Sequence, residues 1–352
     1  MRELLTSVGL TALLVVTATT ASAQNLPRTQ LKIVGLQSHL NSYKNGEKPF
    51  WEEIIPRESN GAITATITPQ DLNGLKGPEI LRLMKLGVID FASGVIGYMA
   101  GDSPEFDGVD LAGLSPDMAT TRKVVDAYKP VLEEVMEEQY GAKLLMLFPS
   151  PPQVLWCRTP IQSAADLEGK KVRVFTASMA DFITGFGATT VTMPFGEVTT
   201  SLERGVIDCA ITGTLSGNTN KMFEVTSHLY PLYSGWSIHF TAASLDSWNK
   251  LDPAVQDFLL EQYAAFNERL WETVAEEEQD GIRCSIGEDP CKYGFKGNMT
   301  LVAVSEEDLA KAKEIVRSTV VPNWAERCGE DCIAQWLETV GEVVGIDSVS
   351  TN

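Results

Sequence analysis

The four residues Gly-Val-Ile-Asp occur twice in the 352-residue chain, at positions 87–90 and 205–208. Each copy stands between a predicted helix and a predicted strand, and each belongs to a longer series in which strands and helices alternate. Such alternation is typical of α/β domains with open, parallel sheets. The repeat favours two units built on one plan, and the length of the chain allows about two domains.

The first alternating series ends at a cluster of prolines. Strands are predicted at 31–35, 62–68, 88–92 and 143–148, and helices at about 49–56, 78–87 and 117–140. Pro149, Pro151 and Pro152 then break the chain, and we place the first crossing between two lobes there. Lobe I is expected to comprise residues 24–149, with a return segment at about 214–252.

A second series starts after these prolines and defines lobe II, residues 150–213, which is completed by part of the C-terminal helices. Its strands are predicted at 154–158, 171–175, 190–193 and 206–212, and its helices at about 180–186 and 197–204. Apolar residues at helical spacing then predict a long helix over 252–282, of about seven turns, that braces both lobes. Residues 283–352 are expected to form a C-terminal helical region.

The N-terminus has the features of a secretory signal peptide, residues 1–23. Arg2 is followed by an apolar stretch too short to span a bilayer and then by Ala21-Ser22-Ala23, small residues that suit a signal peptidase. Cleavage after Ala23 predicts a periplasmic protein. The formal net charge of −19 argues against a nucleic-acid partner.

Six cysteines in an exported chain are more often paired than free. Cys284 with Cys291 and Cys328 with Cys332 are close enough in sequence to form local staples, and Cys157 and Cys209 remain for a third bridge. Because six cysteines allow about 15 connectivities, the sequence alone leaves the pairing open.

The sequence shows no catalytic motif. It lacks a Gly-x-Ser-x-Gly nucleophile elbow, a phosphate-binding loop and a His-Glu-x-x-His zinc helix. His39, His228 and His239 are scattered without metal-like spacing and are interpreted as structural. We therefore expect no enzyme activity, no metal ion and no cofactor, and an exported hydrolase is the alternative from another class.

The most specific pattern lies between residues 166 and 208. It reads Asp166-Leu-Glu-Gly-Lys-Lys-Val-Arg-Val174, Gly187-Ala188, Met193-Pro-Phe-Gly-Glu-Val198 and Leu202-Glu-Arg-Gly-Val-Ile-Asp208. This order and spacing resemble the DctP-like, or dicarboxylate-type, solute-binding proteins of tripartite ATP-independent periplasmic (TRAP) transporters.

The resemblance implies a two-lobed α/β periplasmic binding protein fold with a hinge. It also implies the function: lobe closure captures a small organic acid, which is delivered to the membrane permease subunits of a TRAP transporter. The receptor of an ATP-driven importer, or a sensor, remains the alternative among binding proteins.

By this resemblance, Arg173 of the Lys-x-Arg-Val motif holds the ligand carboxylate. Strand alternation supports this role, because Val172 and Val174 share one face and leave Arg173 on the other, and a guanidinium matches a carboxylate bidentately. The other residues expected to bind the ligand are Phe195, Thr212, Trp236, Trp156, Gln153, Gln37 and Tyr98. The three aromatic rings Trp156, Phe195 and Trp236 favour a monocarboxylate with an apolar or aromatic body.

The chain departs from the family pattern at two places. Members that bind acidic sugars carry a second arginine near Pro152 or Gln153, and its absence here argues against a ligand like sialic acid. Cys209 stands where the family commonly has glycine, which favours a bridge to Cys157 close to the cleft.

Overall fold

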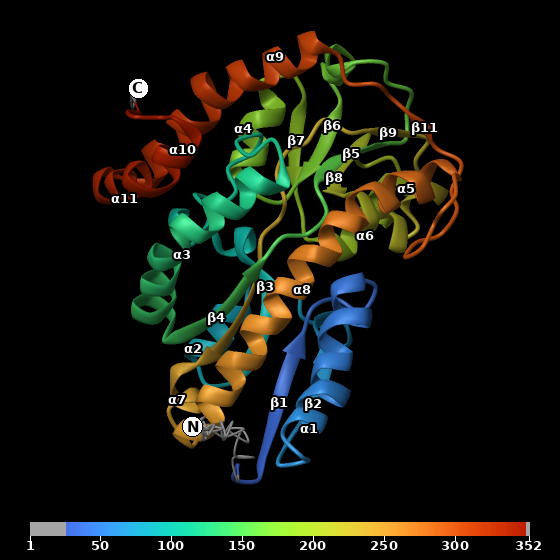
Figure 1. Cartoon of the computed structure of the whole chain (residues 1–352). Coiled ribbons are helices and arrows are strands. Elements are labelled where there is room, and N and C mark those ends of the chain that lie inside the picture. Colours follow the sequence, from blue (N-terminus) through green and yellow to red (C-terminus); the bar gives the residue numbers. More distant parts are fainter. Residues whose placement is uncertain (1–25, 350–352) are drawn as a thin grey trace, which may run out of the picture.

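The computed structural model describes residues 26–349. The predicted signal peptide and its cleavage point at Ala23 lie outside the described residues. Within them, no helix is both long enough and apolar enough to cross a membrane. The chain forms two α/β lobes, one in the lower and one in the upper half of Figure 1, each built around its own sheet.

The first lobe contains a mixed five-stranded sheet. Its strands, in spatial order, are β2 (Ile63–Pro69), β1 (Thr29–Gly35), β3 (Phe91–Val95), β10 (His239–Ser244) and β4 (Ala142–Phe148). β1 is parallel to β2 and β3, whereas β10 is antiparallel to both of its neighbours. The expected all-parallel sheet is therefore interrupted, because β10 enters from the opposite end after the chain has returned from the second lobe.

The second lobe contains a mixed six-stranded sheet. Its strands are β11 (Thr300–Leu301), β9 (His228–Tyr230), β5 (Gln153–Cys157), β8 (Cys209–Gly213), β6 (Lys171–Val174) and β7 (Thr189–Thr192). β6 is parallel to β7 and β8, and β5 is antiparallel to β8 and β9. From β7 to β9, this sheet repeats the order and the directions of the first sheet from β2 to β4.

The repeated Gly-Val-Ile-Asp occupies the same place in both lobes, after helix α2 (Ile80–Lys85) and after helix α5 (Val198–Glu203). Gly87 and Gly205 both have a φ of 70°, the left-handed conformation that ends a helix at glycine. The next residue in each copy, a valine, donates its N–H to a carbonyl of the preceding helix at 2.9 Å. The repeat is therefore a helix cap, which explains why β3 and β8 begin three residues later than predicted.

The chain crosses between the lobes through two neighbouring segments, 149–152 and 231–238. They are hydrogen-bonded to each other: Ser150 N–H donates to the Trp236 carbonyl and Gln153 N–H to the Gly235 carbonyl, both at 2.8 Å. The first crossing contains Pro149, Pro151 and Pro152. The return to the first lobe was placed too early, near residue 214, because β9 still belongs to the second sheet through its pairing with β5.

Helices complete both lobes. The others are α1 (Ile55–Glu58), α3 (Met118–Tyr140), α4 (Ala177–Thr184), α6 (Thr214–Thr219), α7 (Leu245–Trp248), α8 (Pro253–Ile286), α9 (Glu306–Ile315), α10 (Val321–Cys328), α11 (Glu330–Trp336) and α12 (Glu342–Val344). The C-terminal helices contact both α3 of the first lobe and α4 of the second. They also contact the loop before α3, where Trp336 donates its indole N–H to the Gly108 carbonyl at 2.8 Å.

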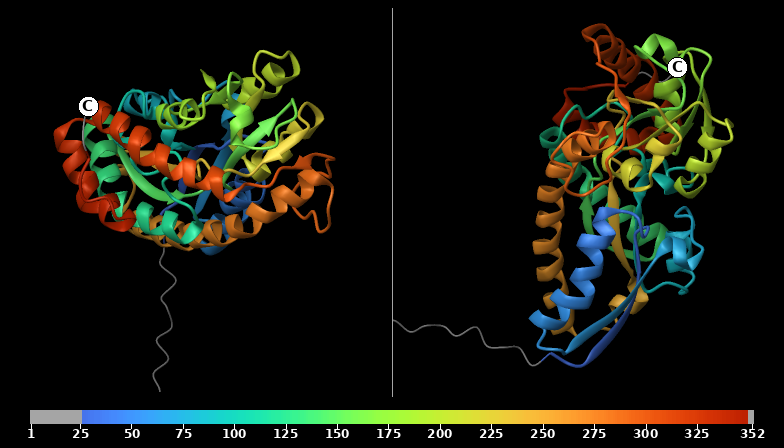
Figure 2. Two further views of the ribbon diagram at one scale, coloured as in Figure 1. Left: turned by 90° about the horizontal axis from the view of Figure 1, so that it is seen from above. Right: turned by 90° about the vertical axis from the view of Figure 1, so that its right-hand side faces the viewer.

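Helix α8 runs along the molecule from one lobe to the other, as the predicted bracing helix should (Figures 1 and 2). Its middle packs on the first sheet, where Trp271 donates its indole N–H to the Leu147 carbonyl of β4 at 3.1 Å. Its last turns pack on α6 of the second lobe, where Gly281 lies against the backbone of Leu215 too closely to admit a Cβ. The helix continues to Ile286, four residues beyond its predicted end.

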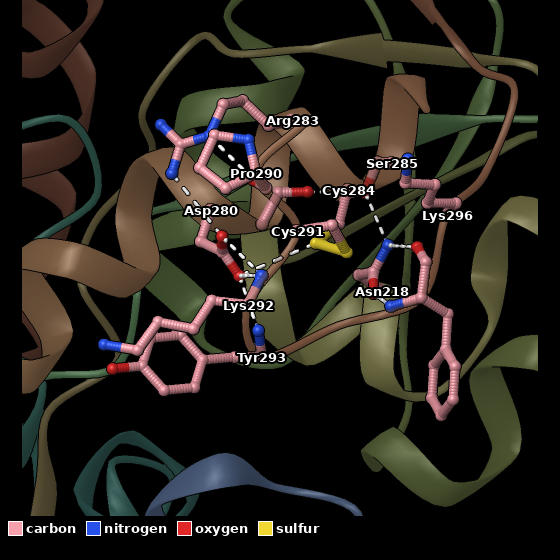
Figure 3. Close-up of a disulfide and its surroundings, with 12 residues drawn as sticks. Asn218, Asp280, Arg283, Cys284, Ser285, Pro290, Cys291, Lys292, Tyr293 and Lys296 are labelled. Atoms are coloured by element: carbon pink, nitrogen blue, oxygen red, sulfur yellow. Dashed lines mark hydrogen bonds and ion pairs between the residues drawn. A yellow bond between two sulfur atoms is a disulfide. The ribbon is translucent and has the colours of Figure 1, made fainter. Parts of the chain in front are cut away.

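The C-terminal end of α8 is fastened to the loop that follows it (Figure 3). The carboxylate of Asp280, whose side chain is 3% exposed, accepts the backbone N–H of Lys292 at 3.0 Å and of Tyr293 at 2.8 Å. Asn218 of α6 both donates to and accepts from the backbone of Phe295. The loop, the helix end and the second lobe are thereby held as one unit.

The six cysteines form three disulfides, Cys157–Cys209, Cys284–Cys291 and Cys328–Cys332. The second joins α8 to the loop in Figure 3. In the first, the two cysteines face each other on the paired strands β5 and β8. This bridge closes the longest loop, with a sequence separation of 52 residues.

Candidate ligand-binding site

A small cavity lies between the two lobes, where strands of both sheets end at the crossings. Its volume is about 40 Å³, enough for about three water molecules. The residues that line it are Gln37, Leu40, Val95, Tyr98, Ser150, Gln153, Arg173, Phe175, Phe195, Thr212, Ser216, Ser237 and His239. Six of the expected ligand-binding residues are therefore together: Gln37, Tyr98, Gln153, Arg173, Phe195 and Thr212.

Arg173 reaches the cavity from the middle of β6 and is 1% exposed. Its Nε donates to the Met193 carbonyl at 3.0 Å and its Nη1 to the Ile211 carbonyl at 2.7 Å, so that backbone on both sides of β6 holds the guanidinium. The guanidinium also stacks over Phe175, 5.0 Å from the ring centroid. Nη2 is buried and has no hydrogen-bond partner.

The electrostatics of the cavity are set by this one cation. No Asp, Glu or Lys is among the lining residues. Burial lowers the pKa of Arg173, because the charged form loses its hydration, and the neighbouring Tyr98 hydroxyl opposes this shift only in part. An unpaired Nη2 on a buried cation is a site for an anion, since the cation is stabilised by an acceptor of opposite charge.

Contacts between the lobes close the cavity on its outer side. The Phe195 N–H of the second lobe donates to the Tyr98 hydroxyl of the first at 3.2 Å, and the Phe195 ring stacks on His39 with the centroids 4.8 Å apart. Lys76 and Glu197 form an exposed ion pair at 2.9 Å across the same opening. His39, Lys76 and Glu197 line an outer cleft of about 410 Å³, which shares Gln37 and Phe195 with the inner cavity.

Trp156 lies outside the cavity. It is fully buried and packs on Gly217, where an added Cβ would be 2.5 Å from the indole. Gln153 and Trp156 are three residues apart on β5, so strand alternation places them on opposite faces. Only Gln153 faces the cavity.

Trp236 also lies outside the cavity, in the second crossing. Its indole N–H donates to the Ser115 carbonyl at 3.2 Å, and its backbone N–H donates to the carboxylate of Asp110 at 3.0 Å. Trp236 therefore anchors the crossing. Of the three rings expected to pack on the ligand, Phe195 alone lines the cavity, where the rings of Tyr98 and Phe175 join it.

Several lining residues were not anticipated from the sequence, above all His239, Phe175, Ser150, Ser216 and Ser237. Phe175 follows Arg173 by two residues, and strand alternation was a usable signal for it. Ser237 takes a φ of 48° in the crossing, a strained conformation for a residue with a side chain. No sequence pattern pointed to the serines or to His239.

The described residues hold no group of three or more His, Cys, Asp or Glu side chains that could bind a metal ion. The polar groups of the cavity are instead an arginine, a histidine, hydroxyls and amides. Such a set recognises a small organic anion by hydrogen bonds and one ion pair.

Comparison with known proteins identifies the family. The model of the DctP family, described as bacterial extracellular solute-binding protein, family 7, matches residues 38–326. A solute-binding protein of Roseobacter denitrificans is 28% identical over 331 residues, which cover 89% of this chain and 93% of the relative.

Two solved structures share the fold. DctP7 of Bordetella pertussis, a receptor that binds pyroglutamic acid, has a TM-score of 0.77 at 20% identity, covering 89% of this chain and 99% of that one. A TRAP periplasmic solute-binding protein of Desulfovibrio salexigens with bound orotic acid has a TM-score of 0.77 at 18% identity, with the same coverage.

These structures confirm the expected two-lobed fold, and the family model confirms the resemblance to DctP-like solute-binding proteins. The family is one of extracellular binding proteins, which agrees with the predicted export. Because the family model covers most of the chain, this protein belongs to family 7 of the bacterial extracellular solute-binding proteins, the DctP family.

Proposed function

We propose that this protein captures a small organic acid in the periplasm, by closure of its two lobes, and delivers it to the membrane permease subunits of a TRAP transporter. In this role it binds its ligand without converting it. One structural neighbour binds pyroglutamic acid and another has bound orotic acid. Both ligands are carboxylic acids, which supports an acid as the ligand here.

The observation that carries this proposal is the free Nη2 of Arg173. The guanidinium is buried, its other nitrogens are held by backbone carbonyls, and the cavity offers no anionic partner. A ligand carboxylate supplies that partner in the bidentate geometry that arginine favours.

Closure follows from the division of the site between the lobes. Gln37 and Tyr98 belong to the first lobe, whereas Arg173 and Thr212 belong to the second. A ligand that touches both sets stabilises the closed arrangement over any arrangement in which the lobes are apart. The closed form then differs in surface from the open form, which gives the permease a way to recognise loaded receptor.

The test is calorimetry with Arg173→Met, using the organic acid that gives the largest thermal shift in a screen of the wild-type protein. Removing one partner of a buried charge pair typically costs about 2–5 kcal/mol, so affinity should fall by roughly 30-fold to several thousand-fold. Lys171→Met is the matched control, because it removes an exposed cation from the same strand.

Wild-type affinity in Arg173→Met, with the control also unchanged, would refute the role of Arg173. A screen of organic acids without any thermal shift, alongside a clear shift with an uncharged solute, would refute the ligand class.

A further inference from the structure

His239 is a second polar group in the cavity lining, and the family pattern did not indicate it. It opens β10, paired on one side with Val95 and on the other with Phe148, so its backbone is fixed by two neighbouring strands. Its ring packs edge-on against Phe148, with the centroids 5.2 Å apart. The imidazole is therefore held in place before any ligand arrives.

The polar edge of this imidazole is without a partner. The residue is 3% exposed, its Nδ1 is buried with no hydrogen bond, and it lines the same cavity as Arg173. A buried ring nitrogen without a partner is costly, and such groups in native structures usually serve a ligand or an ordered water. His239 on β10 of the first lobe and Arg173 on β6 of the second lobe thus each bring an unpaired polar group to the same cavity.

The imidazole is uncharged at neutral pH, because burial lowers the pKa of His239 to about 3 and no acidic group is among the cavity-lining residues. A neutral imidazole offers one donor and one acceptor but no charge. The cavity therefore carries a single positive charge, on Arg173, beside a neutral hydrogen-bonding group. That combination matches one carboxylate next to one uncharged oxygen.

The size of the cavity limits how far apart these two ligand groups can be. Its volume of about 40 Å³ holds about three water molecules. The second oxygen must therefore lie within one or two bonds of the carboxylate, while the rest of the ligand can extend into the outer cleft that shares Gln37 and Phe195 with the cavity. The hydroxyls of Ser237 and Thr212 in the lining can serve the same oxygen.

Building on the proposed function, we propose that His239 binds an oxygen on the carbon next to the carboxylate, so that the ligand is a 2-hydroxy or 2-oxo carboxylic acid. Arg173 binds the carboxylate and His239 pairs with the hydroxyl or carbonyl oxygen. An acid that lacks this oxygen leaves His239 unpaired in the closed site and binds more weakly.

The experiment compares three acids of equal chain length, lactate, pyruvate and propionate, by calorimetry with the wild type, His239→Phe and His239→Gln. The wild type should bind lactate or pyruvate at least about ten-fold more tightly than propionate. His239→Phe should reduce this ratio to within about two-fold, by weakening only the oxygenated acids. His239→Gln, whose amide keeps a donor and an acceptor, should retain a preference.

A ratio unchanged in His239→Phe, or a wild type that binds propionate as well as lactate and pyruvate, would overturn this inference. The wild-type ratio decides the matter even if a variant fails to fold. If none of the three acids binds while a larger acid without this oxygen binds in an Arg173-dependent way, only the ligand class fails. If binding of every acid is insensitive to Arg173→Met, the proposed function fails as well.

Discussion

Replacing Gly97 by alanine should weaken ligand binding without destabilising the ligand-free protein. Gly97 lies in the turn after β3 of the first lobe, and it faces Thr176, the residue that caps α4 in the second lobe. A Cβ at Gly97 would lie 2.8 Å from the Cγ2 of Thr176, closer than two carbon atoms can approach without displacement. The clash exists only when the lobes are together.

The size of the effect follows from the cost of overpacking, which is typically about 1–3 kcal/mol. This cost falls on the closed state alone, and ligand binding is coupled to closure, so the apparent affinity should fall by roughly 5- to 150-fold. Gly97 does not line the cavity, and the direct contacts with the ligand are retained. The loss should appear mainly as faster dissociation.

The assay combines calorimetry with chemical unfolding of the ligand-free protein. Gly101→Ala is the matched control on the same segment, because nothing lies within 4 Å of a Cβ at that position. Thr176→Ser should restore affinity to the Gly97→Ala variant. It removes the methyl group but keeps the hydroxyl that accepts the Met179 N–H at 3.1 Å and caps α4.

If the ligand-free Gly97→Ala protein loses as much free energy of unfolding as the variant loses in binding free energy, this reasoning is refuted. It would mean that the two lobes are in contact before the ligand binds, so that closure is not the coupled step. Failure of Thr176→Ser to restore affinity would locate the effect away from the interface between the lobes.

Two further predictions concern stability. The disulfide Cys157–Cys209 spans 52 residues and Cys284–Cys291 spans 7, so loop-closure entropy stabilises the fold by up to about 4 and about 2 kcal/mol, respectively. Replacing both cysteines of a bridge by alanine should therefore lower the free energy of unfolding more for the first bridge than for the second, and equal losses of unfolding free energy would contradict this. Burial raises the pKa of Glu47 to about 7 from its usual 4.5. The folded state therefore keeps a proton that the unfolded state releases, and stability falls as pH rises from 4.5 to 7. The free energy of unfolding of Glu47→Gln should exceed that of the wild type by up to about 3 kcal/mol at pH 8 but by little at pH 4. An equal difference in unfolding free energy at both pH values would contradict this prediction.

Arg173 was singled out by the resemblance of its Lys-x-Arg-Val motif to the DctP-like receptors, and strand alternation added only which face of the strand it occupies. In Lys-Val-Arg-Val, the two valines share one face of the strand and leave Arg173 on the other, which is also buried in the structure. The same rule could have separated Gln153 from Trp156. Every residue of β5 is buried, however, so burial pattern alone gives no sign of which face meets the ligand.

The parts that sequence did not predict depend on long-range contacts. Trp236 resembles a ligand-binding aromatic until Asp110, 126 residues away, is seen to hold its backbone. In the sequence His239 is an isolated histidine, and its place in the cavity follows only from the position of β10 between β3 and β4. The late start of β3 and β8 is a local error, since a repeated glycine that caps a helix needs further residues to complete its turn.

The chain enters the second lobe at β5 and returns to the first at β10, and this order affects how the protein folds. β10 is the strand that joins β3 to β4, and it is made after almost the whole second lobe. The N-terminal lobe is synthesised first but has a divided sheet with two unpaired edges until residue 244 is available. The two lobes therefore mature as one cooperative folding unit, and the protein resists being cut into independently stable halves.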